Sequence, residues 1–214
     1  GIENEIAFNG GTGVLSDFRG NSLTTKMYEF ILPKLKAKGI YSHQLEVITE
    51  NFPAIKNYEK IGFKVERNLV CFKGKISTSK YNQEIELKTL NDVDETLFPT
   101  FWNAKPSWQN SLPALVRTSK LYEIAGAFYQ SNLIGYIIYG EKGSIKQFAV
   151  KQDFRHLGIG QTLFALVQNE LKDKEIIITN IDNNDQETIS FLKKLGLHLF
   201  LEQFEMKLNK AIYL

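Results

Sequence analysis

Two glycines directly ahead of a predicted helix, Gly158 and Gly160, have the type and spacing of an anion-binding turn. Glycine lets backbone amides approach a ligand because no Cβ stands in the way. The first N–H groups of a helix have no partner within the helix, and the helix dipole adds partial positive charge there. Such a turn binds phosphate or diphosphate, and the Arg155 side chain could add a further positive charge.

The spacing of these glycines separates the possible phosphate ligands. A dinucleotide-binding fingerprint requires a third glycine at position 163, which is Leu163. A P-loop requires Gly-Lys-Ser/Thr, which this segment lacks. A tight turn between a strand and a helix, without any ligand, is the structural alternative.

A strand and a helix must position this loop. Phe148, Ala149 and Val150 form a short apolar run that is typical of a buried strand. After Gly160, apolar residues recur at helical spacing, so one face of the following segment should be buried. These residues are Leu163, Phe164, Leu166, Val167 and Leu171.

The pattern Arg-x-x-Gly-x-Gly after a strand resembles the pyrophosphate loop of the GNAT superfamily of N-acetyltransferases, which binds acetyl-coenzyme A. The resemblance implies a gap between this strand and a parallel strand at residues 176–180, where the pantetheine lies. It also implies that backbone N–H groups near Ala149 and Val150 stabilise the oxyanion. The implied cofactor residues are Phe148, Ala149, Val150, Arg155, His156, Leu157, Gly158, Ile159, Gly160 and Gln161.

The sequence contains an internal repeat, because residues 13–19 align with residues 149–155. In the first copy Ser22 and Thr24 stand where Gly158 and Gly160 stand in the second. The resemblance therefore implies a weaker loop of the same kind. Its residues would be Val14, Arg19, Gly20, Asn21, Ser22, Leu23 and Thr24, together with Asn51.

A second motif follows in the first copy, where Asn51, Ala54, Tyr58, Gly62 and Phe63 have the spacing of the last helix of GNAT domains. The resemblance implies that Tyr58 is the acid that protonates the departing thiolate. A core tyrosine held by its hydroxyl group is the alternative. In the second copy Leu192 occupies the matching position and Gly196-Leu197 replaces Gly-Phe. The second copy thus has the better loop and lacks the acid, although solvent can also protonate a thiolate.

We therefore predict a mixed α/β fold of tandem GNAT type: residues 1–80 form the back half of a first domain, and residues 81–214 a complete second domain. Small polar residues at 74–80 suggest a linker. The front half of the first domain has no counterpart in the sequence, so we expect either preceding residues or strands supplied by another segment, and favour the former. The first part should contain a strand ending near Val14, a helix to about Lys38, a strand at 44–48, a helix at 52–61 and strands at 63–67 and 69–73.

The second domain should begin with a strand at residues 85–89 and a helix from Asn91 or Asp92 towards Trp102. A second helix is expected near 108–117, and three antiparallel strands at 121–129, 133–139 and 144–150. A capping box at Asn184 and Glu187 should start a helix that stops at Gly196. The last strand should span residues 204–208.

Composition excludes several classes of function. The net charge of +2 is too small to indicate nucleic acid binding. The three histidines lack ligand spacing and give no metal signature. No apolar run reaches the roughly eighteen residues of a membrane span, and we expect no signal peptide. The single cysteine, Cys71, lies in an apolar run and reads as an inert buried thiol, which fits a cytoplasmic protein.

The predicted function is transfer of an acetyl group from acetyl-coenzyme A to a primary amine of an unidentified small molecule or peptide. The alternative is a catalytically silent module that binds acyl-coenzyme A or mediates assembly. His156 should be exposed and non-catalytic. Trp102 and Trp108 could form an apolar wall for the acceptor or pin their loop to the core. The acceptor cleft could be lined by Gln147, Tyr122, Glu123, Tyr136 and Tyr139. Oligomeric state is open.

Overall fold

A computed structural model describes residues 1–3, 5–76, 81–172 and 174–209. The chain divides into two compact units, the first formed by residues 1–69 and 202–214 and the second by residues 70–201. Within the described residues, no helix is both long and apolar enough to cross a membrane.

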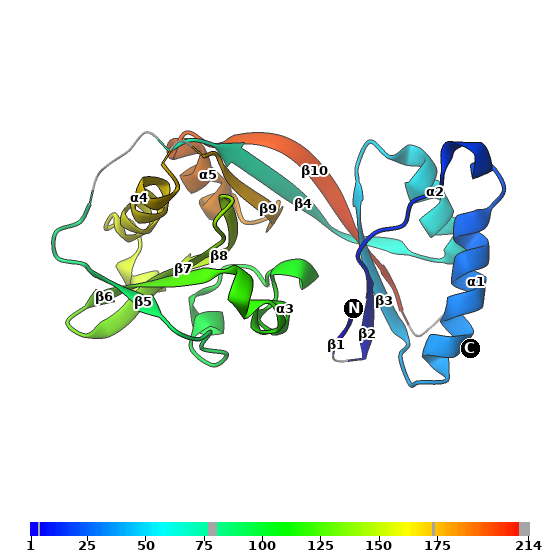
Figure 1. Ribbon diagram of the computed structural model, residues 1–214, viewed down its shortest axis with the longest axis horizontal. Helices are drawn as coiled ribbons and strands as arrows, with labels where there is room; N and C mark the ends of the chain where they lie inside the picture. The colour runs from blue at the N-terminus through cyan, green and yellow to red at the C-terminus, as the bar shows by residue number, and fades with distance from the viewer. Residues whose placement is uncertain (4, 77–80, 173, 210–214) are drawn as a thin grey trace. The chain divides into compact units, whose positions relative to one another are not determined.

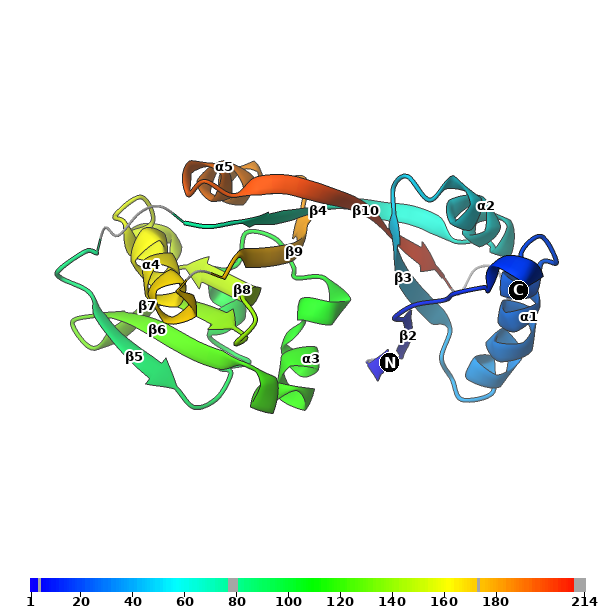
Figure 2. The ribbon, with the colours of Figure 1, turned by 45° about the horizontal axis from the view of Figure 1, so that its top comes forward.

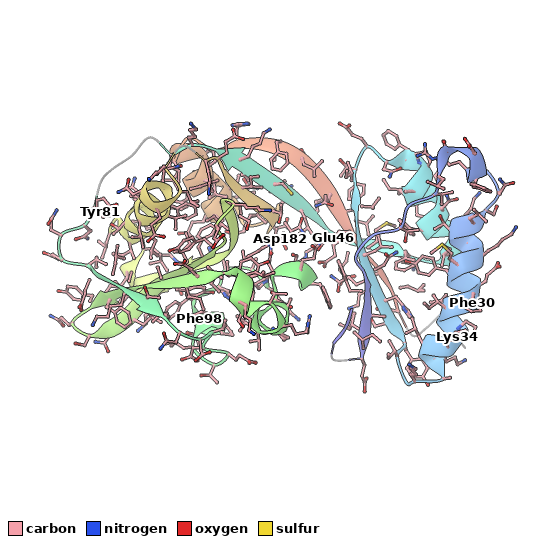
Figure 3. The ribbon with its side chains drawn as sticks, viewed as in Figure 1. Phe30, Lys34, Glu46, Tyr81, Phe98 and Asp182 are labelled. Carbon is pink, nitrogen blue, oxygen red and sulfur yellow. The ribbon has the colours of Figure 1, made fainter. Side chains whose placement is uncertain are left out.

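The first unit is a small mixed sheet with two helices. Parallel strands β2 and β3 pair from Ile6 with Ser42 to Asn9 with Leu45, and β10 pairs with β3 in the antiparallel sense. Its core includes Tyr28, Tyr58 and Phe63, whose rings meet edge to face. Phe30 and Lys34 lie on the outer side of α1 (Figure 3), with the Lys34 ammonium 4.2 Å from the centre of the Phe30 ring. The elements are β1 (Ile2–Glu3), β2 (Ile6–Asn9), η1 (Ser16–Phe18), α1 (Leu23–Lys36), β3 (Ser42–Ile48) and α2 (Phe52–Ile61).

The second unit is built on a sheet of strand order β9-β8-β7-β6-β5. Figure 1 shows α4 and α5 on one side of this sheet and α3 on the other. The strands are β5 (Glu86–Leu90), β6 (Glu123–Tyr129), β7 (Asn132–Tyr139), β8 (Ser144–Val150) and β9 (Ile176–Asp182). The helices are η2 (Phe98–Phe101), η3 (Trp108–Asn110), α3 (Leu112–Arg117), η4 (Ser119–Leu121), η5 (Gln152–Phe154), α4 (Ile159–Leu171) and α5 (Gln186–Lys194).

Two apolar clusters cover the two faces of the second sheet. On the α4 face, Leu163, Phe164 and Val167 pack with buried strand residues such as Ile137. This is the apolar face predicted for the segment after Gly160, and α4 confirms it. On the other face, Leu112 and Leu115 of α3 pack with the aromatic rings of η2 and with strand residues. Both faces are buried, which is typical of a sheet flanked by helices.

Two long strands are shared by the units. Strand β4 (Lys64–Gly74) leads from the first unit into the second, and β10 (His198–Leu208) leads back (Figure 2). The prediction of two separate strands at 63–67 and 69–73 is wrong, because β4 runs without a break from Lys64 to Gly74. The last strand begins at His198 instead of residue 204, and its residues 203–208 pair with β3. The contacts thus divide the chain after residues 69 and 201, whereas the prediction places a single boundary at residue 80. Residues 77–80 of the predicted linker lie outside the described residues.

The strand predicted to end near Val14 instead ends at Asn9. In the second unit, the matching residues of β8 are kept as strand by β7, which pairs as far as Val150. In the first unit β1 pairs with Ile6 and Ala7. Glycines at positions 10, 11 and 13 add no side chains to pack. Without packing and pairing, the extended conformation is not maintained.

The helix predicted from residue 91 or 92 to Trp102 is replaced by a turn and the short helix η2. The Asp94 carboxylate accepts the backbone N–H groups of Thr96 and Leu97, and these bonds lower its pKa. Pro99 lacks an N–H group for a longer helix. The helix predicted at 108–117 is broken at Ser111, whose extended backbone caps α3.

The predicted start of α5 is also corrected by one residue. Asp185, and not Asn184, is the N-cap, because its carboxylate accepts the backbone N–H of Thr188 at 3.1 Å. The predicted stop at Gly196 is confirmed, since its φ of 93° lies in the left-handed region. The helix at 52–61 and the strand at 144–150 have the predicted boundaries.

Candidate functional site

Strands β8 and β9 diverge after a short parallel pairing. Ser144 pairs with Ile177 and Ile145 with Ile178, and there the register of these two fully described strands ends. Beyond this point β8 is held by β7 alone, through pairs such as Tyr136 with Ala149. The backbone edge of β8 that faces β9 is therefore open, as the predicted gap between these strands requires.

A bulge in β8 marks the point of divergence. Ile138 pairs with Gln147 and Tyr139 with Ile145, so Lys146 is an extra residue. Such an insertion bends a strand and changes which face its side chains occupy. Ile145 accordingly belongs to the core on the α4 face, whereas Ala149 belongs to the core on the α3 face.

The bulge also decides which backbone groups of β8 face the gap. Lys151 donates its N–H to the Ile134 carbonyl at 2.8 Å, so its backbone groups point towards β7. Because these groups alternate along an antiparallel strand, those of Ala149 also point towards β7, and those of Phe148 and Val150 point away from it. Of the two residues expected to present their N–H groups to the gap, Val150 therefore does so and Ala149 does not. The N–H of Phe148, which was not part of this expectation, also faces the gap.

A cavity of about 450 Å³ occupies the space between the diverging strands. Lys146, Gln147, Phe148, Ala149 and Val150 of β8 form one wall, and Ile178, Asn180, Ile181 and Asp182 of β9 form the opposite wall. The predicted loop residues Arg155, His156, Gly158, Ile159, Gly160 and Gln161 also line it, whereas Leu157 does not. Asp182, at the end of β9, is marked in Figure 3.

The first turn of α4 directs unpaired amides towards this cavity. Its first helical hydrogen bond runs from the Thr162 N–H to the Gly158 carbonyl, so the N–H groups of Ile159, Gly160 and Gln161 precede it. Gly158 is the N-cap and has a φ of 81°, a conformation that favours glycine. Gly160 is needed for packing, because a Cβ there would lie 2.8 Å from the Phe191 ring.

Arg155 is already bound to protein acceptors. Its Nε donates to the Val150 carbonyl at 3.0 Å and its Nη2 to the Phe101 carbonyl at 2.9 Å. Its Nη1 donates to Asn103 Oδ1 and lies 3.1 Å from Glu187 Oε2. Arg155, predicted to add a positive charge for the phosphate, is thus engaged by protein acceptors, and its role towards a phosphate stays a prediction. Arg155 joins the loop, the segment after η2 and α5.

A chain of polar side chains crosses the closed end of the gap. Trp102 Nε1 donates to the Tyr136 hydroxyl at 2.6 Å, which donates to Gln147 Oε1 at 2.9 Å. Gln147 Nε2 donates to the Asn110 carbonyl, and Asn110 Nδ2 donates to the Thr179 carbonyl of β9 at 2.9 Å. Asn110 thus satisfies a β9 carbonyl located just past the last residue that pairs with β8. Burial raises the pKa of Tyr136, so this hydroxyl stays protonated.

Asn110 also presents an acceptor that is unused by the described residues. It lines the cavity and is 4% exposed, yet none of the described residues donates to its Oδ1. Buried polar atoms are normally paired, and an exception at a cavity points to a ligand or water. An N–H group of a bound molecule would satisfy it.

Of the residues expected to line the acceptor cleft, Gln147 lines the cavity and the other four, Tyr122, Glu123, Tyr136 and Tyr139, do not. Tyr136 supports Gln147, and the Tyr139 hydroxyl bonds Glu170. Trp102 lines the cavity and is also tied to Tyr136, whereas Trp108 packs beneath Arg117. The His156 side chain is 85% exposed, which confirms that it points outwards.

The first copy of the loop has the same backbone conformation as the second. Ser22 is the N-cap of α1 with a φ of 55°, and Gly20 has a φ of 80°, as Gly158 and His156 have positive φ in the second loop. Arg19 Nε donates to the Val14 carbonyl at 3.1 Å, as Arg155 Nε does to the Val150 carbonyl. The repeat therefore extends to the geometry of the loop, including its arginine.

The segment between β2 and this first loop is tied to helices. Asn9 Nδ2 donates to Thr12 Oγ1 and to the Tyr28 hydroxyl, both at 2.8 Å. Thr12 also shares a hydrogen bond with the Tyr58 hydroxyl. Burial raises the pKa of Tyr28 to about 12 and also raises that of Tyr58. Asn51 caps α2, since its Oδ1 accepts the Ala54 N–H. Tyr58 is thus a protonated core residue of the first unit with its hydroxyl engaged.

Replacing Tyr58 with phenylalanine tests its predicted role as proton donor. Because the hydroxyl shares a hydrogen bond within the core, we expect a loss of about 1 kcal/mol of stability and unchanged turnover. Thermal melting and steady-state rates of acetyl transfer measure the two effects. A decrease in turnover of about a hundredfold or more would instead assign Tyr58 as a general acid.

Among the cavity residues that were not predicted as site residues are Asn103, Asn110 and Glu187. Asn103 Nδ2 donates to Glu187 Oε2 at 3.0 Å, and Glu187 lies against the loop. The sequence pattern identifies Glu187 only as part of a helix cap, and isolated asparagines in a loop carry no pattern. Only contacts between distant segments bring them to the cavity.

The sequence matches the family model described as "Acetyltransferase (GNAT) family" over residues 3–63 and 87–197. No curated relative matches it. Solved structures of similar fold include a GCN5-related N-acetyltransferase from Sphaerobacter thermophilus, with a TM-score of 0.68 and 15% identity, covering 92% of this chain and 71% of that one.

Two further structures have comparable similarity. A tandem GNAT protein from the clavulanic acid biosynthesis pathway has a TM-score of 0.68 and 11% identity, covering 97% of this chain and 76% of that one. A putative acetyltransferase from Pyrococcus horikoshii has a TM-score of 0.67 and 15% identity, covering 99% and 68%. At these identities the likeness concerns the fold.

Proposed function

The chain belongs to the acetyltransferase (GNAT) family, and from this premise we propose that its second unit transfers an acetyl group from acetyl-coenzyme A to a primary amine. The observation that carries the proposal is the cavity between β8 and β9, which ends at the unpaired amides of α4. One opening thus offers an open strand edge to a pantetheine and a helix N-terminus to a diphosphate.

Each part of the carrier has a matching wall. The diphosphate would accept hydrogen bonds from the N–H groups of Ile159, Gly160 and Gln161. The pantetheine amides would pair with the open edge of β8 at Phe148 and Val150. The thioester would then lie near the closed end of the gap, beside Gln147 and Asn110.

The transfer itself is a direct acyl exchange. The amine nitrogen attacks the thioester carbonyl carbon and loses a proton to water, the C–S bond breaks, and coenzyme A leaves as a thiolate that takes up a proton. The negative oxygen of the intermediate would be stabilised by an N–H group of Phe148 or Val150, a contribution of about 3–4 kcal/mol. Leu192 is buried at the position that matches Tyr58, so in this unit we propose that water protonates the thiolate.

The acceptor is an amine on a small molecule or peptide, and the proposal involves no nucleic acid or membrane. The single cysteine, Cys71, is a buried thiol. This suits a reducing compartment, and we propose a cytoplasmic enzyme.

Two measurements test the proposal on the whole chain. Acetyl-coenzyme A should raise the melting temperature, because a ligand that binds only the folded state stabilises it. With acetyl-coenzyme A and a panel of primary amines, free thiol should then appear at a rate that depends on the amine. Thermal stabilisation without thiol release from any amine would favour the silent binding module. Neither effect would contradict both functions.

A further inference from the structure

The open end of the cavity, its mouth, lies between the loop after β8 and the start of α5, and the Glu187 carboxylate links these two segments. Glu187 lies in the first turn of α5, which follows β9, and it contacts two residues of the loop that follows β8. Its Oε2 is 3.1 Å from Arg155 Nη1, and its Oε1 is 3.5 Å from His156 Nε2. The negative charge of Glu187 therefore lies against the loop after β8, although β8 and β9 have diverged by this point.

The packing of α5 on α4 brings this charge close to the amides of the first turn. Phe191 follows Glu187 by one helical turn, and residues four apart lie on the same face of a helix. The Phe191 ring packs so closely on Gly160 that a Cβ there would lie 2.8 Å from it. The face of α5 that carries Glu187 is thus the face that meets the start of α4.

The two other carboxylates among the residues that line the cavity, Asp182 and Asp185, accept backbone N–H groups. Asp185 accepts the Thr188 N–H as helix cap, and Asp182 accepts the Asn184 N–H at 2.9 Å. Asn103 Nδ2 donates both to Asp185 Oδ1, at 3.3 Å, and to Glu187 Oε2, and Glu187 also pairs with Arg155. Glu187 is therefore the carboxylate that pairs with the guanidinium of this loop.

We infer that Glu187 determines how strongly the site prefers thioesters that carry phosphate groups, an inference that rests on the proposed function. Its charge repels a diphosphate at the start of α4, and its pairing keeps Arg155 directed across the mouth. In the wild-type protein the diphosphate is therefore held by backbone amides with little help from Arg155. Removing the charge weakens the repulsion and leaves the positive charge of Arg155, whose other acceptors are neutral, able to attract the phosphates.

The test compares two thioesters on Glu187→Gln. Glutamine keeps the size and the carbonyl acceptor of glutamate and lacks its charge. The probes are acetyl-coenzyme A and S-acetylpantetheine, which has the thioester arm without phosphates. We expect acetyl-coenzyme A to bind Glu187→Gln roughly three- to tenfold more tightly than wild type in calorimetric titration at low salt. The affinity for S-acetylpantetheine should change less than about twofold, because it carries no phosphate charge.

A matched control is Glu84→Gln, which removes the same charge from an exposed residue outside the cavity. This variant should bind both thioesters as the wild type does. The gain in affinity for acetyl-coenzyme A in Glu187→Gln should also decrease at about 1 M salt, where the screening length is about 3 Å. Melting without ligand checks that both variants are folded.

The outcomes separate this inference from the proposed function. Wild-type binding of acetyl-coenzyme A with no gain, or a loss, in folded Glu187→Gln overturns the inference and leaves the proposed function intact. An equal gain for both thioesters also overturns it, because the effect would not involve phosphate. If neither thioester binds wild type or variant, the proposed function fails and the inference fails with it.

Discussion

A Gly158→Val variant is expected to show no thermal stabilisation by acetyl-coenzyme A. At a hundredfold excess over Kd the ligand should stabilise the wild type by about 2.7 kcal/mol. For a chain of this size that corresponds to roughly 5–10 °C in Tm. Gly158 has a φ of 81°, which a β-branched residue avoids, so valine distorts the turn that presents the amides. Differential scanning fluorimetry with and without ligand measures the change.

The control for this variant is Gly39→Val, at the end of α1 in the first unit. Gly39 has a φ of 75°, and a Cβ built there meets nothing within 4 Å. Valine should therefore add comparable backbone strain without touching the cavity. Gly39→Val should lower the melting temperature of the free protein and keep the full ligand shift. A full shift in Gly158→Val as well would remove this loop from the carrier site.

Replacing Gly143 with alanine is expected to destabilise the second unit by about 3 kcal/mol. Gly143 precedes β8 and has a φ of 88°, so any side chain costs about 1–2 kcal/mol in backbone strain. A Cβ there would also lie 2.1 Å from the Glu175 carbonyl oxygen, a backbone atom just before β9. Relieving such an overlap typically costs a further 1–3 kcal/mol. Urea denaturation gives the change in the free energy of unfolding.

This substitution also has a functional consequence. The Gly143 carbonyl accepts the Ile177 N–H at 2.9 Å, at the closed end of the gap between β8 and β9. Moving β9 away to accommodate alanine should widen this end and weaken acetyl-coenzyme A binding. At Gly39 φ is also positive, but no atom lies within 4 Å of the added Cβ. Gly39→Ala should therefore lower the free energy of unfolding by only about 1 kcal/mol. Equal losses in the two variants would show that the Glu175 contact is not limiting.

The parts of the site that were predicted correctly depend on short stretches of sequence. The start of α4 and its unpaired amides follow from Gly158, Gly160 and the apolar stripe, because helix initiation depends on a few adjacent residues. The stop at Gly196 has the same local origin. The antiparallel strands β6 and β7 were also predicted, apart from two residues at the start of β6 and one at the start of β7, because Gln130 and Ser131 adopt a tight turn between them.

The predictions that failed depend on partners distant in the sequence. Residues 10–14 match β8 in the alignment, yet in the first unit the strand ends at Asn9 because its pairing with β1 is confined to the start of β2. The final strand was expected to complete the second domain, whereas residues 203–208 pair with β3 of the first unit. Strand pairing is a choice among distant segments, and a local pattern does not encode that choice.

By itself, the sequence determined the family, the repeated loop and the glycine turn that begins α4, since each of these is written in neighbouring residues. Only the tertiary structure decided what the side chains around that turn do. The sequence predicts Arg155 as a cation for phosphate, and the fold pairs it with Glu187, Asn103 and two backbone carbonyls. The physical reason is that a guanidinium binds whichever acceptors folding brings within reach, and these lie on segments far apart along the chain.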